Sequence, residues 1–212
     1  MSKIRGFEVA LTTERMVEEG KATVKGVEQF KDVILPKRET ARAAGYDFRA
    51  AEDTVIPSIW RGAAQVLKGK GAEVVNWVHE TIKGTKDSNK QQGLKDDNKK
   101  YFMPTKIHTG IKSYMQEDEV LELYVRSSTP KKLGLILANS VGIIDADYYN
   151  NIDNDGEIIF MFYNILPFDV TIKKGERFGQ GIFKKFYIAD NDNAGGERTG
   201  GIGSSDADAN IK

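Results

Sequence analysis

A ten-residue stretch, Asn139 to Tyr148, contains side chains suited to binding and cleaving a nucleotide. The Asn139 amide can donate to and accept from the edge of a pyrimidine, and Gly142 allows close approach of the backbone. Asp145 follows an apolar pair, so we expect it at a strand end with little solvent, where a carboxylate can take a proton from a water placed at a phosphorus atom. Tyr148 can present its ring to a sugar. A turn that Asn and Asp merely cap is the alternative for each residue alone.

Other residues suit an anion. Arg126 ends an expected strand and precedes the hydroxyls of Ser127 and Ser128, a group that can bind phosphate. Gln180, in the segment GERFGQGIF, can donate to phosphate oxygens. Asp47 lies between residues expected to face inwards, and a buried carboxylate needs a partner, so an ion pair or a turn cap is at least as good an interpretation as catalysis. Ser-Ser turns and hairpins are common, so the structural interpretations stay open here too.

Short strands separated by turns are predicted for most of the chain. Residues 120–126 alternate apolar and polar side chains, as a half-buried strand does. Residues 158–163 form an apolar run typical of a strand buried on both faces. Residues 168–172, the turn KKGE and residues 177–188 predict a hairpin. Together these segments predict an all-β sandwich or barrel.

An insertion interrupts this pattern at residues 58–100. Apolar residues recur at helical spacing over residues 59–83, with Ser58 as a candidate cap and glycines at 69 and 71 marking a break. Residues 84–100 are almost entirely polar and are expected to form a solvated loop. We therefore predict a β domain over residues 1–57 and 101–189, a helical and polar insertion at 58–100, and a flexible arm at 190–212. A packing cap is the simplest role for the insertion, and binding of a protein partner is the alternative.

Composition excludes several classes of function. Lys and Arg total 31 and Asp and Glu total 31, so the formal charge is zero and gives no sign of broad attraction to nucleic acid or to a membrane. The absence of cysteine excludes disulfides, zinc-thiolate sites and a Cys nucleophile. No signal peptide and no run of 18 apolar residues is present, so we expect a soluble, cytoplasmic protein.

Five segments in order resemble the five motifs of the trimeric dUTPase family: AGYDFRA (44–50), VRSSTPKKLGL (125–135), NSVGIIDADYY (139–149), GERFGQGIF (175–183) and ERTGGIGSSD (197–206). The resemblance covers roughly residues 30–57 and 102–206. It implies a β-barrel of jelly-roll type, a homotrimer in which each site draws on more than one chain, and hydrolysis of dUTP to dUMP and pyrophosphate.

The resemblance also implies a role for each matched residue. Asp145 is the expected general base. Uracil is read by Asn139 and main-chain groups, with Gly142 and Ile144 in the same pocket, while Tyr148 packs on the deoxyribose and excludes a 2′-hydroxyl. The expected phosphate ligands are Arg126, Ser127, Ser128 and Gln180 from a neighbouring chain and Arg198, Ser204 and Ser205 from the closing arm. Mg²⁺ is expected to be held by the triphosphate and water, and Asp47 to give structural support.

Three departures from the family pattern affect these expectations. Ile202 replaces the Phe that is usual in the fifth motif, so it can cover the base but cannot stack on it. Arg198 lies one position after the place of the family's arginine. We therefore expect a weaker or differently shaped lid. The loop after Tyr149 is extended, and Asp153 and Asp155 offer a local metal or partner site, although a plain exposed loop is the simpler interpretation. Two alternative functions are a nucleotide-responsive regulator that uses residues 58–100, and a dCTP deaminase, against which the DADY segment argues.

Overall fold

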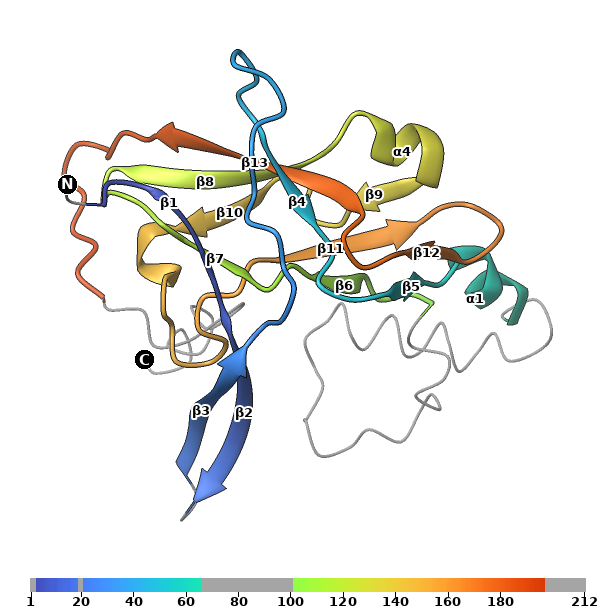
Figure 1. Cartoon of the computed structure of the whole chain (residues 1–212), viewed down its shortest axis with the longest axis horizontal. Coiled ribbons are helices and arrows are strands. Elements are labelled where there is room, and N and C mark those ends of the chain that lie inside the picture. The colour runs from blue at the N-terminus through green and yellow to red at the C-terminus, as the bar shows by residue number, and fades with distance from the viewer. Residues whose placement is uncertain (1–2, 19–20, 66–100, 197–212) are drawn as a thin grey trace.

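Strands form most of the regular secondary structure in this computed structural model, which describes residues 3–18, 21–65 and 101–196 (Figure 1). The strands are β1 (Gly6–Val9), β2 (Leu11–Glu18), β3 (Lys21–Gln29), β4 (Tyr46–Arg49), β5 (Thr54–Ile56), β6 (Thr105–His108), β7 (Ile111–Tyr114), β8 (Glu119–Val125), β9 (Leu135–Leu137), β10 (Gly142–Asp145), β11 (Ile159–Asn164), β12 (Val170–Ile172) and β13 (Arg177–Lys185). The helices are α1 (Ile59–Gln65), α4 (Ser128–Leu133) and the 3-10 turn η2 (Ala146–Tyr148). The predicted all-β class is confirmed.

Two sheets enclose the core. One has the order β10-β8-β13-β4 and the other the order β6-β11-β9. The ring of Phe160 on β11 lies 5.0 Å from that of Phe178 on β13 and 5.4 Å from that of Phe48 on β4. All three side chains are buried. Burial of such large apolar side chains between the two sheets is the main contribution to their association.

The predicted strand at residues 120–126 is β8, the second strand of the larger sheet. Leu121 and Leu123 are buried while Glu122 and Tyr124 are half-buried, as the alternation predicts. The prediction for residues 158–163 is wrong in one respect. In β11 Phe160 and Phe162 are buried, but the residues that alternate with them, Ile159, Met161 and Tyr163, are only partly buried. The outer face of this strand is apolar without being enclosed in the single chain.

The predicted hairpin around the turn KKGE is wrong, although the turn itself forms. Strand β12 before the turn pairs with β5, whereas β13 after it pairs with β4 and β8. The chain from β4 to β5 makes a matching bend, and Gly175 N donates to Ala50 O at 2.8 Å. Residues 173–176 are therefore a corner at which a two-stranded ribbon passes from one sheet to another, a change that local sequence does not encode.

The turn before β10 is also a corner. Strand β9 belongs to the smaller sheet and β10 to the larger one, and a tight turn at residues 138–141 joins them. Ser140 in this turn has a φ of 59°, in the left-handed region. The turn thus leads Asn139 out of one sheet and places Asp145 at the end of a strand in the other.

Helix α1 begins where the apolar periodicity predicts, one residue after Ser58. The Ser58 hydroxyl accepts from Trp60 N at 3.1 Å and therefore caps the helix. The helix lies against the turn before β12, since Trp60 Nε1 donates to Ile165 O at 2.9 Å and Arg61 pairs with Asp169 at 3.0 Å. The rest of the predicted insertion, residues 66–100, lies outside the described residues.

A two-stranded hairpin, β2 with β3, projects from the body of the molecule (Figure 1). The sequence pattern does not predict this hairpin, since it places residues 1–57 in one β domain. Strand β1, just before it, pairs with β7 along Gly6–Val9. Within residues 3–18, 21–65 and 101–196, no helix is long and apolar enough to cross a membrane.

Candidate active site

Asp145 lies at the last position of β10, opposite Val120 on β8, and η2 begins at the next residue. It lines a cavity of about 540 Å³ together with Met115, Glu117, Ala146, Asp147 and Phe186. The position of Asp145 at a strand end agrees with the prediction. The prediction that Asp145 is shielded from solvent is wrong for the single chain, because its side chain is exposed. Strand β10 is an edge strand of its sheet, so no further strand among the described residues pairs with its outer side.

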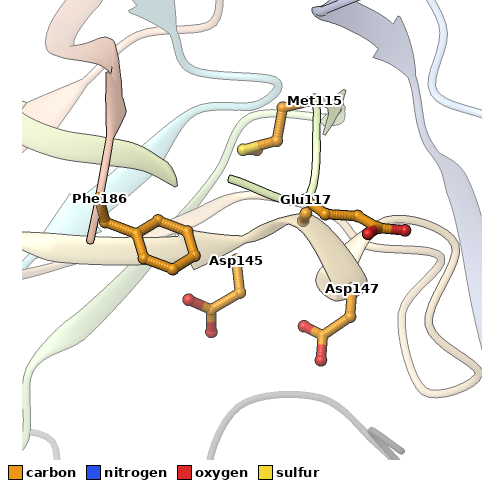
Figure 2. Close-up of a pocket in the computed structure, with 6 residues that line it drawn as sticks. Met115, Glu117, Asp145, Asp147 and Phe186 are labelled. Atoms are coloured by element: carbon orange, nitrogen blue, oxygen red, sulfur yellow. The ribbon is translucent and has the colours of Figure 1, made fainter. Parts of the chain in front are cut away.

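Figure 2 shows the carboxylates of Asp145 and Asp147 pointing to the same open side, with the Phe186 ring beside Asp145. The cavity therefore combines a carboxylate in contact with solvent, which can accept a proton, with apolar surface from Phe186 and Met115. Sequence reasoning missed Met115, Glu117 and Phe186, because only the pairing of β8 with β10 and β13 brings them to this place.

No group of three or more His, Asp or Glu residues in the described part of the chain is close enough to hold a metal ion. A divalent cation at this cavity would therefore need most of its ligands from elsewhere. Phosphate oxygens and water are the ligands that Mg²⁺ commonly uses.

Asn139 is exposed in the turn before β10, and its side chain lies over Gly142. A Cβ atom on Gly142 would meet Asn139 Nδ2 at 3.4 Å and Leu123 Cβ at 3.1 Å, so glycine keeps this stretch of backbone open. Ile144 packs into the core with 9% of its surface exposed. It can therefore contribute little beyond its main-chain groups to a base pocket. The Asn139 amide and the main-chain groups from Gly142 to Ile144 form one surface along β10.

Tyr148 is buried, with 5% of its surface exposed, and belongs to the core cluster. Its hydroxyl donates to Glu157 O at 3.0 Å. The ring therefore has a fixed position, and only a small part of it can contact a ligand.

The extended loop after Tyr149 is anchored rather than freely exposed. Asp155 accepts from Leu11 N at 2.8 Å and pairs with Lys112 at 2.9 Å, and Lys112 Nζ also donates to Asn150 Oδ1 at 2.6 Å. The suggestion that Asp153 and Asp155 form a metal site is not supported, because the Asp155 carboxylate is engaged by protein donors. The loop instead ties η2 to β2 and β7.

A cationic group lies at the other end of β8. Arg126 Nε donates to Asp47 Oδ1 at 2.9 Å, and Arg177 Nη1 lies 3.3 Å from Asp47 Oδ2. Asp47 is 9% exposed, so it is a nearly buried carboxylate that holds two arginines in place. This corresponds to the ion-pair interpretation of Asp47. The cavity beside it has a volume of about 250 Å³ and is lined by Arg126, Ser128, Thr129, Lys132, Leu133, Glu176 and Arg177.

Two further predicted phosphate ligands lie beside this cationic group. Ser127 is exposed at the N-cap of α4, where its hydroxyl makes no capping hydrogen bond to the described helix. Gln180, on β13, donates through Nε2 to Val125 O at 3.1 Å. Its Oε1 lies 2.3 Å from where a Cβ on Gly45 would be, so a side chain at position 45 would displace the Gln180 amide. The structure thus brings Asp47, Arg126, Ser127, Ser128 and Gln180 together.

Asp145 and Arg126 do not meet within one chain. Asp145 lies opposite Val120 on β8. Arg126 directly follows β8 and is six residues after Val120 in the sequence. At about 3.3 Å per residue the two positions are roughly 20 Å apart. Arg198, Ile202, Ser204 and Ser205 lie outside the described residues, so the predicted contributions of the arm stay predictions.

Comparisons with known proteins find similarity to dUTPases both in sequence and in structure. A Lactococcus lactis protein named deoxyuridine 5′-triphosphate nucleotidohydrolase is 37% identical over 209 residues, which cover 97% of this chain and 99% of that protein. The crystal structure of a dUTPase from Streptococcus mutans superposes with a TM-score of 0.53 at 36% identity, covering 76% of this chain and 95% of that one. A dUTPase of phage phi11 of S. aureus, described as coordinating a structural Mg(II) ion, has a TM-score of 0.50 at 13% identity, covering 91% of this chain and 97% of that one. No family model matches the chain.

Proposed function

The chain belongs to the deoxyuridine 5′-triphosphate nucleotidohydrolase (dUTPase) family and is a dUTP diphosphatase, and we propose that it acts at sites assembled between the chains of a homotrimer. The observation that carries this proposal is the separation of roughly 20 Å between Asp145 and Arg126 in one chain. A triphosphate is much shorter than this, so one substrate cannot contact both groups of the same chain. A base from one chain and a phosphate-binding group from its neighbour can meet on one nucleotide.

In the proposed site, the surface along β10 binds uracil through the Asn139 amide and the main chain from Gly142 to Ile144. A pyrimidine with an amino group at its 4-position would place a donor where the site also donates, which excludes cytosine. Tyr148 lies below this surface and leaves no room for a 2′-hydroxyl. The fixed position of its ring supports this role.

Asp145 acts as the general base. A water oxygen forms a bond to the α-phosphorus, the bond from the α-phosphorus to the oxygen that bridges to the β-phosphorus breaks, and the water proton moves to the Asp145 carboxylate. Pyrophosphate leaves with the electron pair of the broken bond. The exposed position of Asp145 at a strand end, in a cavity with room for a phosphate, supports this step.

The phosphate chain is held by Arg126, Ser127, Ser128 and Gln180 of the neighbouring chain. Asp47 keeps Arg126 and Arg177 in position, so little side-chain freedom is lost when the anion binds. Mg²⁺ would be held mainly by the triphosphate oxygens and water, and would supply neutralisation of the phosphate charge when bound with the substrate. The arm, through Arg198, Ile202, Ser204 and Ser205, covers the bound nucleotide.

Pyrophosphate release from dUTP, dCTP, dTTP and UTP tests the proposal. We expect hydrolysis of dUTP alone, and a fall in kcat of about a hundredfold or more in Asp145→Asn. The matched control is Asp147→Asn, because Asp147 lines the same cavity two residues further on and should retain most of the activity. Equal activity in both variants would refute the role of Asp145. Ammonia release from dCTP would indicate a deaminase instead.

A further inference from the structure

The hydroxyl of Tyr148 belongs to a hydrogen-bond triangle formed with the extended loop. It donates to Glu157 O at 3.0 Å and accepts from Asn154 Nδ2 at 2.8 Å. The same Asn154 nitrogen lies 3.2 Å from Glu157 O, so its two hydrogens can serve both oxygens. The end of the tyrosine ring is thereby held from the loop side as well as by the core.

Asn154 is itself held by the loop. Its Oδ1 accepts from Asn151 Nδ2 at 2.7 Å and from Gly156 N at 3.3 Å. Asn151 Oδ1 accepts in turn from the main-chain N–H groups of Asp153 and Asn154, at 3.0 and 3.3 Å. An amide side chain with both ends engaged in this way has little freedom to rotate.

The loop as a whole is fastened to the body of the chain. Asp155 pairs with Lys112, which is on β7, and accepts from Leu11 N. Gly156 has a φ of 77°, and a Cβ there would lie 2.6 Å from Tyr148 O, so the loop closes tightly over η2. Movement of Asn154 away from Tyr148 would therefore disrupt several contacts at once.

We propose that Asn154 is a positioning residue for sugar selection, which acts by fixing the ring of Tyr148 against a 2′-hydroxyl. The inference rests on the proposed function, since it assigns the control of ribose exclusion at that same site. This proposal gives the extended loop a role in sugar selection. That role replaces the metal or partner site that the acidic residues of the loop suggested.

The physical argument concerns rigidity. A side chain excludes a hydroxyl from a binding site only to the extent that displacing the side chain costs free energy. The core holds the body of the Tyr148 ring, while the triangle with Asn154 and Glu157 holds its end. Loss of the Asn154 bond lowers the cost of a small tilt of the ring, so a ribonucleotide gains affinity while a deoxyribonucleotide, which requires no tilt, is affected little.

The test compares deoxyribose and ribose ligands in the full-length protein. Titration calorimetry gives Kd values for dUMP and UMP, and hydrolysis assays give kcat/KM for dUTP and UTP. For Asn154→Ala we expect both selectivity ratios to fall about fivefold, the effect of one hydrogen bond, through improved binding of the ribonucleotide. Tyr148→Phe should lower the ratios similarly, and the double variant should fall no further than either single variant.

Ile152→Ala is the matched control, because Ile152 belongs to the same loop and is 62% exposed. Its selectivity should stay closer to that of the unaltered protein than that of Asn154→Ala does. Unchanged ratios in Asn154→Ala, additive losses in the double variant, or an equal loss in Ile152→Ala would overturn the proposal. Because nucleotide monophosphate binding does not depend on catalysis, a protein that binds dUMP but fails to hydrolyse dUTP would refute the proposed function alone.

Discussion

Replacement of Asp47 by alanine should destabilise the protein by about 2 kcal/mol. The Asp47 side chain is 10% exposed, and it pairs with Arg126 at 2.9 Å and Arg177 at 3.3 Å, whose side chains are 25% and 33% exposed. Loss of one partner of a buried ion pair costs about 3–5 kcal/mol, and loss of an exposed one about 0–1 kcal/mol. The two arginines remain partly solvated, so the expected cost lies between these ranges. Asp47→Asn keeps a hydrogen-bond acceptor and should lose about half as much.

The assay is urea unfolding followed by circular dichroism, at one fixed protein concentration, because unfolding of an oligomer depends on concentration. Asp118→Ala is the control, since Asp118 pairs with Lys185 at an exposed site and should show no measurable change. The KM for dUTP should also rise in Asp47→Ala, because Arg126 loses its fixed position. An Asp47→Ala protein as stable as the Asp118→Ala protein would refute the reasoning.

Three further perturbations test the fold and the metal requirement. Gly134→Ala should lower Tm, because Gly134 has a φ of 58° and a Cβ would lie 2.3 Å from Leu166 Cγ; Gly196→Ala, which meets nothing within 4 Å, should leave Tm unchanged. The hydrogen bond that His108 donates to the Glu157 carboxylate raises the pKa of His108 above its ordinary 6.5, so the stabilisation from this pair is complete below pH 6.5 and is lost as pH rises through the folded pKa. Urea unfolding across this pH range should show the decline, and His108→Gln should flatten it. Chelation of Mg²⁺ with EDTA should reduce dUTP hydrolysis at least about tenfold while circular dichroism stays unchanged; full activity in EDTA would contradict the metal requirement.

Elements with a local signature were predictable from the sequence. The alternation around Leu121 and Leu123 predicts β8, and the apolar spacing after Ser58 predicts the start of α1, because each pattern reports the burial of one face of one element. The sequence also indicates that a buried Asp47 needs a partner, with an ion pair or a turn cap both open, but that the partners are Arg126 and Arg177 follows only from the structure.

Features that depend on tertiary pairing were not predictable in the same way. The turns at residues 138–141 and 173–176 resemble hairpin turns locally, but their flanking strands enter different sheets. Phe186 and Glu117 reach the Asp145 cavity only through strand pairing. The anchoring of Asp155 needs Lys112, 43 residues away in sequence, so the acidic loop alone suggested a metal site that the structure does not support.

Subunit complementation tests the central claim most directly. Asp145→Asn and Arg126→Ala chains are each expected to be almost inactive alone. If each site takes Asp145 from one chain and Arg126 from another, random mixed trimers of the two variants should recover about one quarter of the unaltered activity, since one site in four receives both intact residues. Mixed trimers as inactive as the separate variants would place both residues in a site within one chain and contradict the account.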